Sequence, residues 1–590
     1  MTGTQSPSDA TGTAAAETAP AQARLDEFDK RLGDPWDGGN PLGFTAVLEA
    51  DERAEMFADG ERALDDYGLN AEFVPVEHGG RLTRVDHLVE IMRTVYRRDP
   101  CLGLGYGFSS FISSVNVWTA ADDAQQRQVA DILLRGGKIA AAYHELAHGN
   151  DMARTDFQAL PSGAGRLLLN GRKEVVTNIQ RSDAMVMFAR TDARQGSRSH
   201  SQILVEKDRV ADGRMSYLPR FASAGMRGVQ LGGVEFRDCP VPENRVLGNL
   251  GQGLETMLKS FQITRTTLVG MFTGALDTGL RTTLRHVHDR RLYGRTAVEL
   301  PQVRSTLAGV FLDLLISEVF ATVSTRALHL VPAETGIYAQ AVKYHVSKTL
   351  IDAMNRLSGV LGAHFYIRDP HSTNAIFQKM LRDIQPAGFG HIARSVCQMS
   401  LLQQLPLLAR RSWLPGDPAP DDLFRLDADL PPMPFDQLAV SAGGRERLSS
   451  SLAAGLEALS ADDPEHREIR RLAEGFVAEL AALAEECGRL PVTERTVDAS
   501  SHSYDLTARY TNVLVAAACH ETWRHNQHHP DPFWRDPAWL IAALHRLSAP
   551  AGAVRAPLPD HLEHHLFTEL TARHEAGQSF GINKNGLSAG

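Results

Sequence analysis

Apolar residues recur every three to four positions along most of this chain, the spacing that places them on one face of an α-helix. In the first quarter of the sequence, such stretches lie at residues 46–67, 85–96 and 116–134. The same periodicity resumes at Gly253 and persists to about residue 410. The pattern therefore predicts a helical domain over residues 25–142 and a helical bundle over residues 251–412.

Between these helical parts, the pattern changes to short runs of apolar and β-branched residues separated by turns. Residues 166–177 predict a strand, a turn and a second strand, because Asn170-Gly171 readily adopts the two positive φ angles of a tight hairpin. Further strands are predicted at residues 184–189, 201–205 and 233–236. We expect residues 143–250 to form a small antiparallel β domain within a mainly α-helical protein.

Three remaining segments flank these domains. Residues 1–24 are rich in Thr, Ala, Ser, Gln and Pro, which predicts a disordered tail, and they lack the basic and apolar regions of a secretory signal. Residues 413–440 are rich in Pro and Asp and are predicted to be a linker, whereas residues 441–590 form a further helical domain. We recognise no apolar run that approaches the roughly 20 residues of a membrane span, so none is expected.

Charge and cysteine content exclude several classes of protein. The 590 residues contain 61 Lys and Arg against 71 Asp and Glu, a net charge of −10, whereas a nucleic-acid binder usually carries a basic surface. The five cysteines lie far apart and form no C-x-x-C pair, which argues against a cysteine-based zinc site and a disulfide framework. We therefore expect a cytoplasmic protein that does not bind nucleic acid.

One short motif suggests zinc chemistry. His144-Glu145-Leu-Ala-His148 matches the H-E-x-x-H pattern, in which two histidines one helical turn apart bind zinc and the glutamate acts as a base. Gly149-Asn150-Asp151 follows at once and ends any helix. We therefore predict no metal site at this motif.

Eight segments carry short motifs that can be compared with those of known proteins. They are residues 67–80, 98–107, 143–151, 170–178, 241–248, 261–265, 290–302 and 381–383. Taken in chain order, they resemble motifs of the acyl-CoA dehydrogenase family over about residues 25–410. Residues 143–151 are similar to a loop of the acyl-CoA oxidases, which accounts for the H-E-x-x-H match without zinc. The resemblance implies a fold with a helical N-terminal domain, a β domain and a four-helix bundle, here with an added C-terminal helical domain. It also implies FAD as the cofactor, held between the β domain and the bundle.

The resemblance implies roles for four residues of the β domain. Glu145 and Asn150 would lie in the loop that lines the flavin and the thioester. The Thr177 hydroxyl, with Asn178 beside it, would bind near the reactive edge of the flavin. Val175 stands where an aromatic residue of the family usually covers the flavin, so the shape of this side of the site is expected to differ.

A second group of residues is implied to act on a neighbouring subunit. Arg290, Tyr293 and Gln302 resemble the segment that contacts the FAD diphosphate of the adjacent chain, with Arg281 to Arg295 as the candidate basic stretch. An arginine suits this work because its guanidinium grips phosphate oxygens with two hydrogen bonds. A site shared in this way implies a homodimer or a homotetramer.

The catalytic base is where this chain departs most from the resemblance. The family usually has a glutamate eight positions after the Asp of an Arg-Asp pair, and here His391 stands eight positions after Asp383. Some members instead carry a glutamate just before the arginine of the long helix, where this chain has Thr264 before Arg265. Because imidazole titrates near neutrality, we hypothesise that His391 is the base, with Thr264 and Arg265 at the substrate.

The leading hypothesis is FAD-dependent α,β-dehydrogenation of an acyl thioester on CoA or an acyl carrier protein, in a specialised role such as secondary metabolism. Electrons would pass to an acceptor flavoprotein or to oxygen. Three alternatives remain open. They are a reduced-flavin-dependent monooxygenase of the same fold, a redox-neutral flavoprotein acting on an acyl thioester, and a degenerate scaffold protein without enzyme activity.

Overall fold

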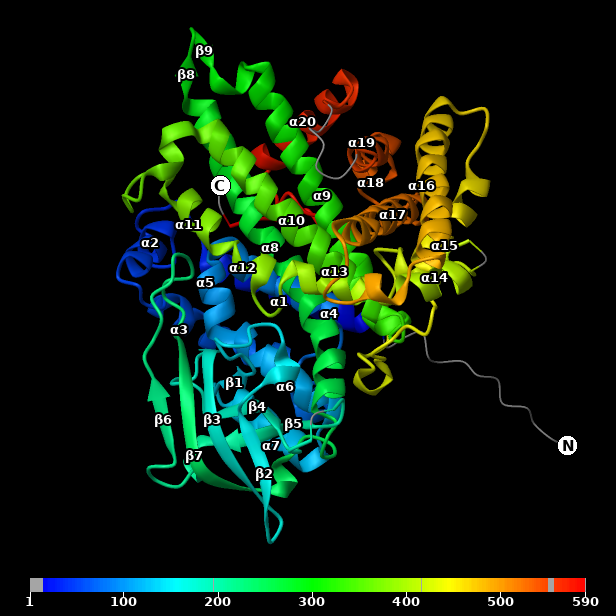
Figure 1. Cartoon of the computed structure of the whole chain (residues 1–590). Coiled ribbons are helices and arrows are strands. Elements are labelled where there is room, and N and C mark those ends of the chain that lie inside the picture. The colour runs from blue at the N-terminus through cyan, green and yellow to red at the C-terminus, as the bar shows by residue number, and fades with distance from the viewer. Residues whose placement is uncertain (1–13, 195, 415, 550–556, 589–590) are drawn as a thin grey trace, which may run out of the picture.

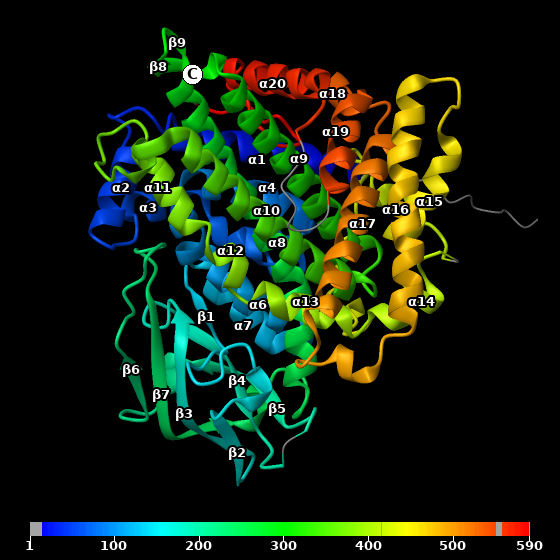
Figure 2. The same ribbon diagram turned by 45° about the horizontal axis from the view of Figure 1, so that its top comes forward.

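Helices make up most of the molecule, and a curled seven-stranded sheet lies at one end of it (Figure 1). The computed structural model describes residues 14–194, 196–414, 416–549 and 557–588. The C-terminal helices, orange to red, pack beside the long central helices at a distance from the sheet (Figure 2). This arrangement confirms the predicted class, which is mainly α-helical with a β domain and an added C-terminal helical part.

The N-terminal helices are shorter than the periodicity predicts. The stretch at residues 46–67 is divided in two near Ala54, whose φ of +53° takes the backbone out of the helical region. The stretch at residues 116–134 is divided at Asp122, which forms a capping box with Gln125. The helices here are α1 (Ala14–Leu32), α2 (Phe44–Glu52), α3 (Ala58–Tyr67), α4 (Val85–Arg98), α5 (Pro100–Leu102), α6 (Ser109–Ala120) and α7 (Asp123–Leu134).

The predicted disordered tail of residues 1–24 is wrong in its second half. Residues 1–13 lie outside the described residues, but α1 begins at Ala14. The side chains of Leu25, Phe28 and Leu32 recur at helical spacing and are buried in the core. The helix is therefore held by packing of its C-terminal half. The polar composition of residues 1–24 does not indicate that a helix begins within them.

The sheet is mixed, so the prediction of an antiparallel β domain is wrong at β4, to which both β1 and β2 run parallel. Its order is β1-β4-β2-β3-β7-β6, with β5 paired to the other side of β4, and β1 runs parallel to β4. The strands predicted at residues 184–189, 201–205 and 233–236 are confirmed as parts of β4, β5 and β7. The strands are β1 (Ile139–Ala142), β2 (Gln158–Gly163), β3 (Arg166–Thr177), β4 (Ala184–Arg190), β5 (His200–Glu206), β6 (Met215–Leu218) and β7 (Leu231–Pro242).

The predicted hairpin at Asn170-Gly171 is also wrong, because this pair lies inside the continuous strand β3. The register between β3 and β7 shifts between Leu169 and Gly171, which marks a β-bulge. Gly171 has a φ of +116°, and a Cβ there would lie 3.2 Å from the Cα of Phe157. The glycine therefore serves the bulge, and residues 163–165, all with positive φ, make the turn between β2 and β3.

The bundle is built around α8, which is buried along most of its 37 residues and contacts α4, α6, α9 and α10. A short hairpin of β8 (Arg291–Leu292) and β9 (Arg295–Thr296) follows its C-terminus. The helices of this part are α8 (Gly253–Asp289), α9 (Pro301–Leu330), α10 (Thr335–Leu361), α11 (Ala375–Asp383), α12 (Pro386–Phe389), α13 (Arg394–Leu402) and α14 (Leu405–Arg411).

Helix α9 corrects the expectation that no stretch of the chain is apolar enough to span a membrane. It contains an 18-residue window with a mean hydropathy of 1.8, so it passes that test by length and composition. In the fold, however, 89% of this window is buried inside the protein. A helix that is apolar on all sides is expected wherever other helices surround it, and α9 is such a core helix.

The predicted linker, residues 413–440, is a strap fixed to the bundle. Arg326 of α9 donates hydrogen bonds to the backbone carbonyls of Asp422, at 2.7 Å, and Ala428, at 3.0 Å. The side chains of Trp413 and Leu423 are buried. The strap leads to α15 (Leu448–Gly455), α16 (Pro464–Gly488), α17 (Ser501–His525), α18 (Pro532–Arg535), α19 (Pro537–Leu547) and α20 (Asp560–Glu575).

Buried carboxylates of the bundle hold the last residues of the chain. Asp277 of α8 accepts a hydrogen bond from the backbone N–H of Phe580 at 2.9 Å, and Glu318 of α9 accepts one from Ile582 at 2.8 Å. Arg93 lies 3.3 Å from the Glu318 carboxylate. The C-terminal helical part therefore shares one hydrophobic core with the bundle and is tied to it at its end.

We predict that Gly581→Ala destabilises this attachment. A Cβ at Gly581 would lie 2.3 Å from a Glu318 carboxylate oxygen that already accepts the Ile582 N–H. Overpacking of this kind costs about 1–3 kcal/mol. Limited proteolysis should release C-terminal fragments faster than in the wild-type protein. Gly586→Ala is the control, because nothing lies within 4 Å of a Cβ there. Equal cleavage of both variants contradicts the prediction.

Candidate functional site

A cavity of about 410 Å³ lies where the sheet meets the helices. The β side is formed by Val175 and Thr177 at the end of β3 and by Leu231 of β7. The helical side is formed by Leu268 and Phe272 of α8, together with residues of α6 and α12. The remaining wall is largely the loop between β1 and β2 and the loop after α12. The described lining residues include no Lys or Arg. Glu145 is the one residue among them that has a carboxylate.

The β1–β2 loop is fixed to the sheet by its backbone and by one buried carboxylate. The N–H of Glu174 in β3 donates to the carbonyl of His144 at 3.1 Å, which sets the loop against the strand. The Glu145 carboxylate lies 2.7 Å from the Lys173 Nζ and accepts hydrogen bonds from the Thr155 hydroxyl and the Asp156 N–H. Glu145 lines the cavity, but its oxygens are occupied by the wall itself.

The charges of Glu145 and Lys173, which form a buried ion pair, neutralise each other. Burial alone would raise the pKa of Glu145, but the Lys173 ammonium holds it below its usual value. Burial lowers the pKa of Lys173 to about 8, against the opposing effect of Glu145. We infer that Glu145 is ionised and serves to hold the loop, rather than to exchange protons in the cavity.

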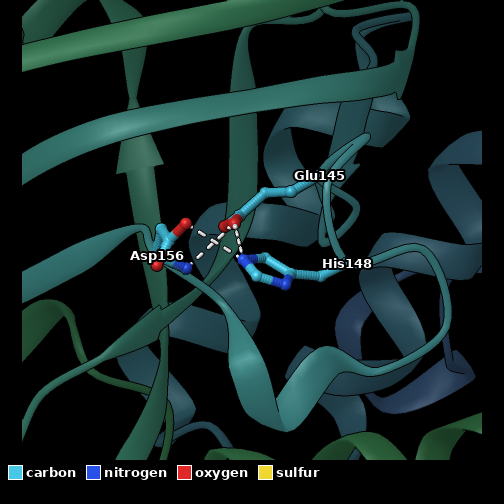
Figure 3. Close-up of side chains that lie close together, drawn as sticks. All are labelled: Glu145, His148 and Asp156. Carbon is cyan, nitrogen blue, oxygen red and sulfur yellow. Dashed lines mark hydrogen bonds and ion pairs between the residues drawn. The ribbon is translucent and has the colours of Figure 1, made fainter.

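The H-E-x-x-H segment does not have the geometry of a zinc-protease motif. His144 forms a β-bridge with Val175 and residues 146–150 form a turn, so the two histidines do not share a helical face. His144 Nδ1 lies 3.3 Å from the Gly149 carbonyl oxygen, whereas His148 Nε2 lies 3.0 Å from the Asp156 carboxylate. Figure 3 shows Glu145, His148 and Asp156 converging, but the Lys173 ammonium beside Glu145 opposes a cation there.

His391, the predicted base, reaches the cavity from the loop after α12. Its φ of +65° is in the left-handed region, which is uncommon outside glycine. Its ring packs against Phe261 with 4.1 Å between centroids, and its Nε2 lies 2.5 Å from the Thr264 hydroxyl. The structure therefore brings together two residues, His391 and Thr264, that stand at the two alternative positions of the family base.

His391 is held as a neutral imidazole. Burial lowers its pKa well below 6.5, and the nearby charges of Arg265, Lys343 and His144 lower it further. Arg265 does not line the cavity. Its guanidinium lies over the Phe261 ring, and among the described residues its Nε and Nη1 have no hydrogen-bond partner. Arg265 therefore lies near His391 and outside the cavity lining, and its contact with a substrate stays a prediction.

The predicted flavin residues divide into two groups. Thr177 and Asn150 line the cavity, Thr177 half-buried and Asn150 exposed at its edge. Asn178 does not line it, because its buried amide donates to the Gly105 carbonyl at 2.5 Å and to the Ser109 hydroxyl at 2.9 Å. These two bonds join the end of β3 to α6 and to the π-helical segment Gly103–Phe108 before it. Asn178 therefore supports the wall of the cavity, and its place beside the flavin stays a prediction.

Arg290, Tyr293 and Gln302 lie far from the cavity of their own chain. Phe272, the residue of the cavity lining nearest to the C-terminus of α8, lies 18 residues before Arg290, which corresponds to about 27 Å at about 1.5 Å per residue. The hairpin that follows is exposed, with Tyr293 at 89% of its maximum. These residues can meet a cofactor in such a cavity only if that cavity belongs to another molecule.

Two residues of the site are given no role by sequence reasoning. His144 lines the cavity, but in the sequence it is only one member of the zinc pattern and of the oxidase-like segment 143–151. Lys343 is fully buried on α10 and lies close to His391. The sequence indicates its burial only through the helical spacing, which places Lys343 on the same buried face as Ala339 and Val346.

Two family models match the chain. Residues 140–239 match the acyl-CoA dehydrogenase middle domain, and residues 251–391 match the acyl-CoA dehydrogenase C-terminal domain. Mitochondrial isovaleryl-CoA dehydrogenase of Pongo abelii is 26% identical over 43% of this chain and 60% of its own length. The probable acyl-CoA dehydrogenase FadE25 of Mycobacterium tuberculosis is 23% identical over 60% of this chain and 90% of its own length.

Solved structures show the same fold. Butyryl-CoA dehydrogenase from Megasphaera elsdenii has a TM-score of 0.57 at 16% identity and covers 67% of this chain and 98% of its own. The prolyl acyl carrier protein oxidase AnaB has a TM-score of 0.57 at 17% identity and covers 65% of this chain and 98% of its own. Almost the whole of each structure is therefore matched, and about a third of this chain is additional to it.

We predict that Lys173→Met is strongly destabilising, because it leaves the buried Glu145 carboxylate without its cation. Breaking a buried ion pair from one side costs about 3–5 kcal/mol. Urea denaturation followed by circular dichroism measures the change. Arg172→Met is the matched control on the same strand, since its pair with Glu235 is exposed to solvent. A Lys173→Met protein as stable as Arg172→Met contradicts the assigned role of the pair.

Proposed function

We propose that this chain, which carries the middle and C-terminal domains of the acyl-CoA dehydrogenase family, oxidises the α,β carbon–carbon bond of an acyl thioester with FAD. Homologues in this family are flavin oxidoreductases that act on CH–CH groups of acyl-CoA. The observation that carries the proposal is His391, a neutral imidazole held against Thr264 at an apolar cavity between sheet and bundle.

The cavity fits the ring system of FAD better than its diphosphate. Val175 and Leu231 offer apolar contact to the ring, and the Thr177 hydroxyl and the Asn150 amide offer hydrogen bonds to its polar edge. A diphosphate needs cations, however, and the described lining residues include no Lys or Arg. When bound, the flavin supplies the acceptor for the hydride that leaves the β-carbon.

Side chains of the protein, rather than the flavin, remove the proton from the substrate. His391 takes the α-proton, and Thr264 fixes the ring so that one nitrogen faces the cavity. Arg265 lies behind this pair without a carboxylate partner among the described residues. Its uncompensated charge favours the negative charge that develops on the thioester oxygen when the α-proton leaves. The largely apolar lining excludes water and suits an apolar acyl group.

Assembly of two or more chains follows from the same proposal. The candidate diphosphate residue Arg290 lies about 39 Å along α8 from Thr264, and Gln302 lies at the start of α9 just after the exposed hairpin, so we assign both to the cavity of a neighbouring molecule. We therefore propose a homodimer or homotetramer whose active sites are shared between subunits. The acyl group is proposed to arrive on CoA or on an acyl carrier protein, and electrons leave to an acceptor flavoprotein or to oxygen.

We predict that His391→Asn lowers the rate of flavin reduction by an acyl thioester by about a hundredfold or more, because loss of a positioned base typically costs that much. Anaerobic stopped-flow absorbance of the flavin-loaded protein measures the rate. His371→Asn is the control, since His371 is exposed on the loop before α11. A protein that purifies without flavin but binds reduced flavin tightly contradicts the proposal and favours the monooxygenase alternative.

The wild-type rate of flavin reduction should fall when the pH is lowered well below neutrality. The pKa of His391 is lowered below 6.5, so the ring is already unprotonated at neutral pH. The rate should therefore be level near pH 7 and fall only as the pH drops through the lowered pKa. Flavin reduction rates measured across a pH series test this. A rate that rises steadily from pH 6 to pH 8 contradicts the assignment of a depressed pKa to the base.

A further inference from the structure

Lys343 is a buried cation that the reaction as described does not use. It lies in the middle of α10, its side chain is fully buried, and its Nζ donates a hydrogen bond to the Gly390 carbonyl at 2.9 Å. No carboxylate among the described residues pairs with it, and the charged or titratable groups that face it are Arg265, Arg394 and Cys397. A lysine so placed costs free energy to bury, so it needs a compensating role.

The hydrogen bond from Lys343 acts on the peptide that precedes His391. The Gly390 N–H donates to the Pro386 carbonyl at 2.7 Å, so this residue is held from both of its backbone polar groups. A Cβ at Gly390 would lie 2.8 Å from that Pro386 oxygen, which leaves no room for another residue. His391 follows with its φ of +65°, a conformation that costs about 1–3 kcal/mol and must be maintained by its surroundings.

We propose that Lys343 is the positioning residue for His391. Its hydrogen bond to Gly390 fixes the left-handed backbone that turns the imidazole toward Thr264 and the cavity. Its positive charge adds to the effect of burial and of Arg265 in keeping that ring unprotonated. That this positioning serves catalysis rests on the proposed function, whereas the hydrogen bond and the position of His391 do not depend on it.

The charges around His391 come from three different elements. Arg265 lies on α8, Lys343 on α10 and His144 on the β1–β2 loop, and after burial these are the groups that lower the His391 pKa. Cys397 and Arg394 of α13 face Lys343 from the other side. Burial lowers the pKa of Lys343 itself to about 8, so its charge is present at neutral pH and is lost as the pH rises through that value. Removing this charge should let His391 take up a proton more readily.

The test compares Lys343→Met, which removes both donor and charge, with Lys343→Arg, which keeps both. Each flavin-loaded protein is labelled with histidine carrying carbon-13 at Cε1, and the His391 signal is assigned by its loss in His391→Asn. In Lys343→Met the titration midpoint of His391 should rise by about one pH unit, the effect of one nearby buried charge. In Lys343→Arg it should stay near the wild-type value. Flavin reduction should fall roughly tenfold or more in Lys343→Met and recover in Lys343→Arg.

Lys207→Met is the matched control. The Lys207 Nζ also donates to a backbone carbonyl, that of Ile179, and burial lowers its pKa to about 8, but it lies in the β domain away from His391. It should leave the His391 titration unchanged. If Lys343→Met does not fold, Lys343→Gln takes its place, since it keeps a donor without the charge and should show the same rise.

Two results would overturn the proposal. One is a His391 titration that shows no upward shift in the charge-removing variant. The other is a Lys343→Arg protein that titrates and reacts like Lys343→Met. Failure of the proposed function looks different, because then the wild-type protein shows no flavin reduction by acyl thioesters while the titrations still report on Lys343.

Discussion

The length and burial of α8 constrain the whole molecule. This single helix of 37 residues contacts the N-terminal helices, the sheet and the other bundle helices. Near its first third it presents Thr264 to His391, and beyond its last turn it carries the exposed β8–β9 hairpin. Because a helix is stiff, these two places are separated by about 39 Å in every copy of the chain. Within one molecule, the residues proposed to move the proton are therefore far from the residues proposed to bind the FAD phosphates.

The second organising feature is how charge is distributed around the cavity. Glu145, the carboxylate in the lining, is neutralised by Lys173 in the wall. Behind His391, by contrast, Arg265 and Lys343 are buried without carboxylate partners among the described residues. Burial and these cations lower the pKa of His391, so the imidazole is unprotonated at neutral pH but is a weaker base than a free histidine. A neutral imidazole remains unprotonated beside them, and the negative charge of a developing enolate is favoured by the same cations.

Sequence reasoning succeeds here where local pattern determines structure and fails where tertiary contacts decide. The periodicity of residues 253–410 and the strands at 184–189 and 201–205 are confirmed, since each depends on which faces are apolar. Asn170-Gly171 has the composition of a hairpin turn, but the pairing of β3 with β7 places it in a bulge. The meeting of Thr264 with His391 could be anticipated only through the family resemblance. Lys343 and His144 could not, because their roles depend on neighbours distant in the sequence.

The central claim is that His391 removes the α-proton of an acyl thioester, and it can be measured without any redox step. An acyl thioester with sulfur in place of the β-carbon keeps an acidic α-proton but cannot be dehydrogenated. The measurement is the exchange of that α-hydrogen with deuterium from heavy water, followed by proton NMR. The account predicts catalysed exchange by the flavin-loaded wild-type protein and none above background by His391→Asn. Equal exchange by the two proteins would contradict it.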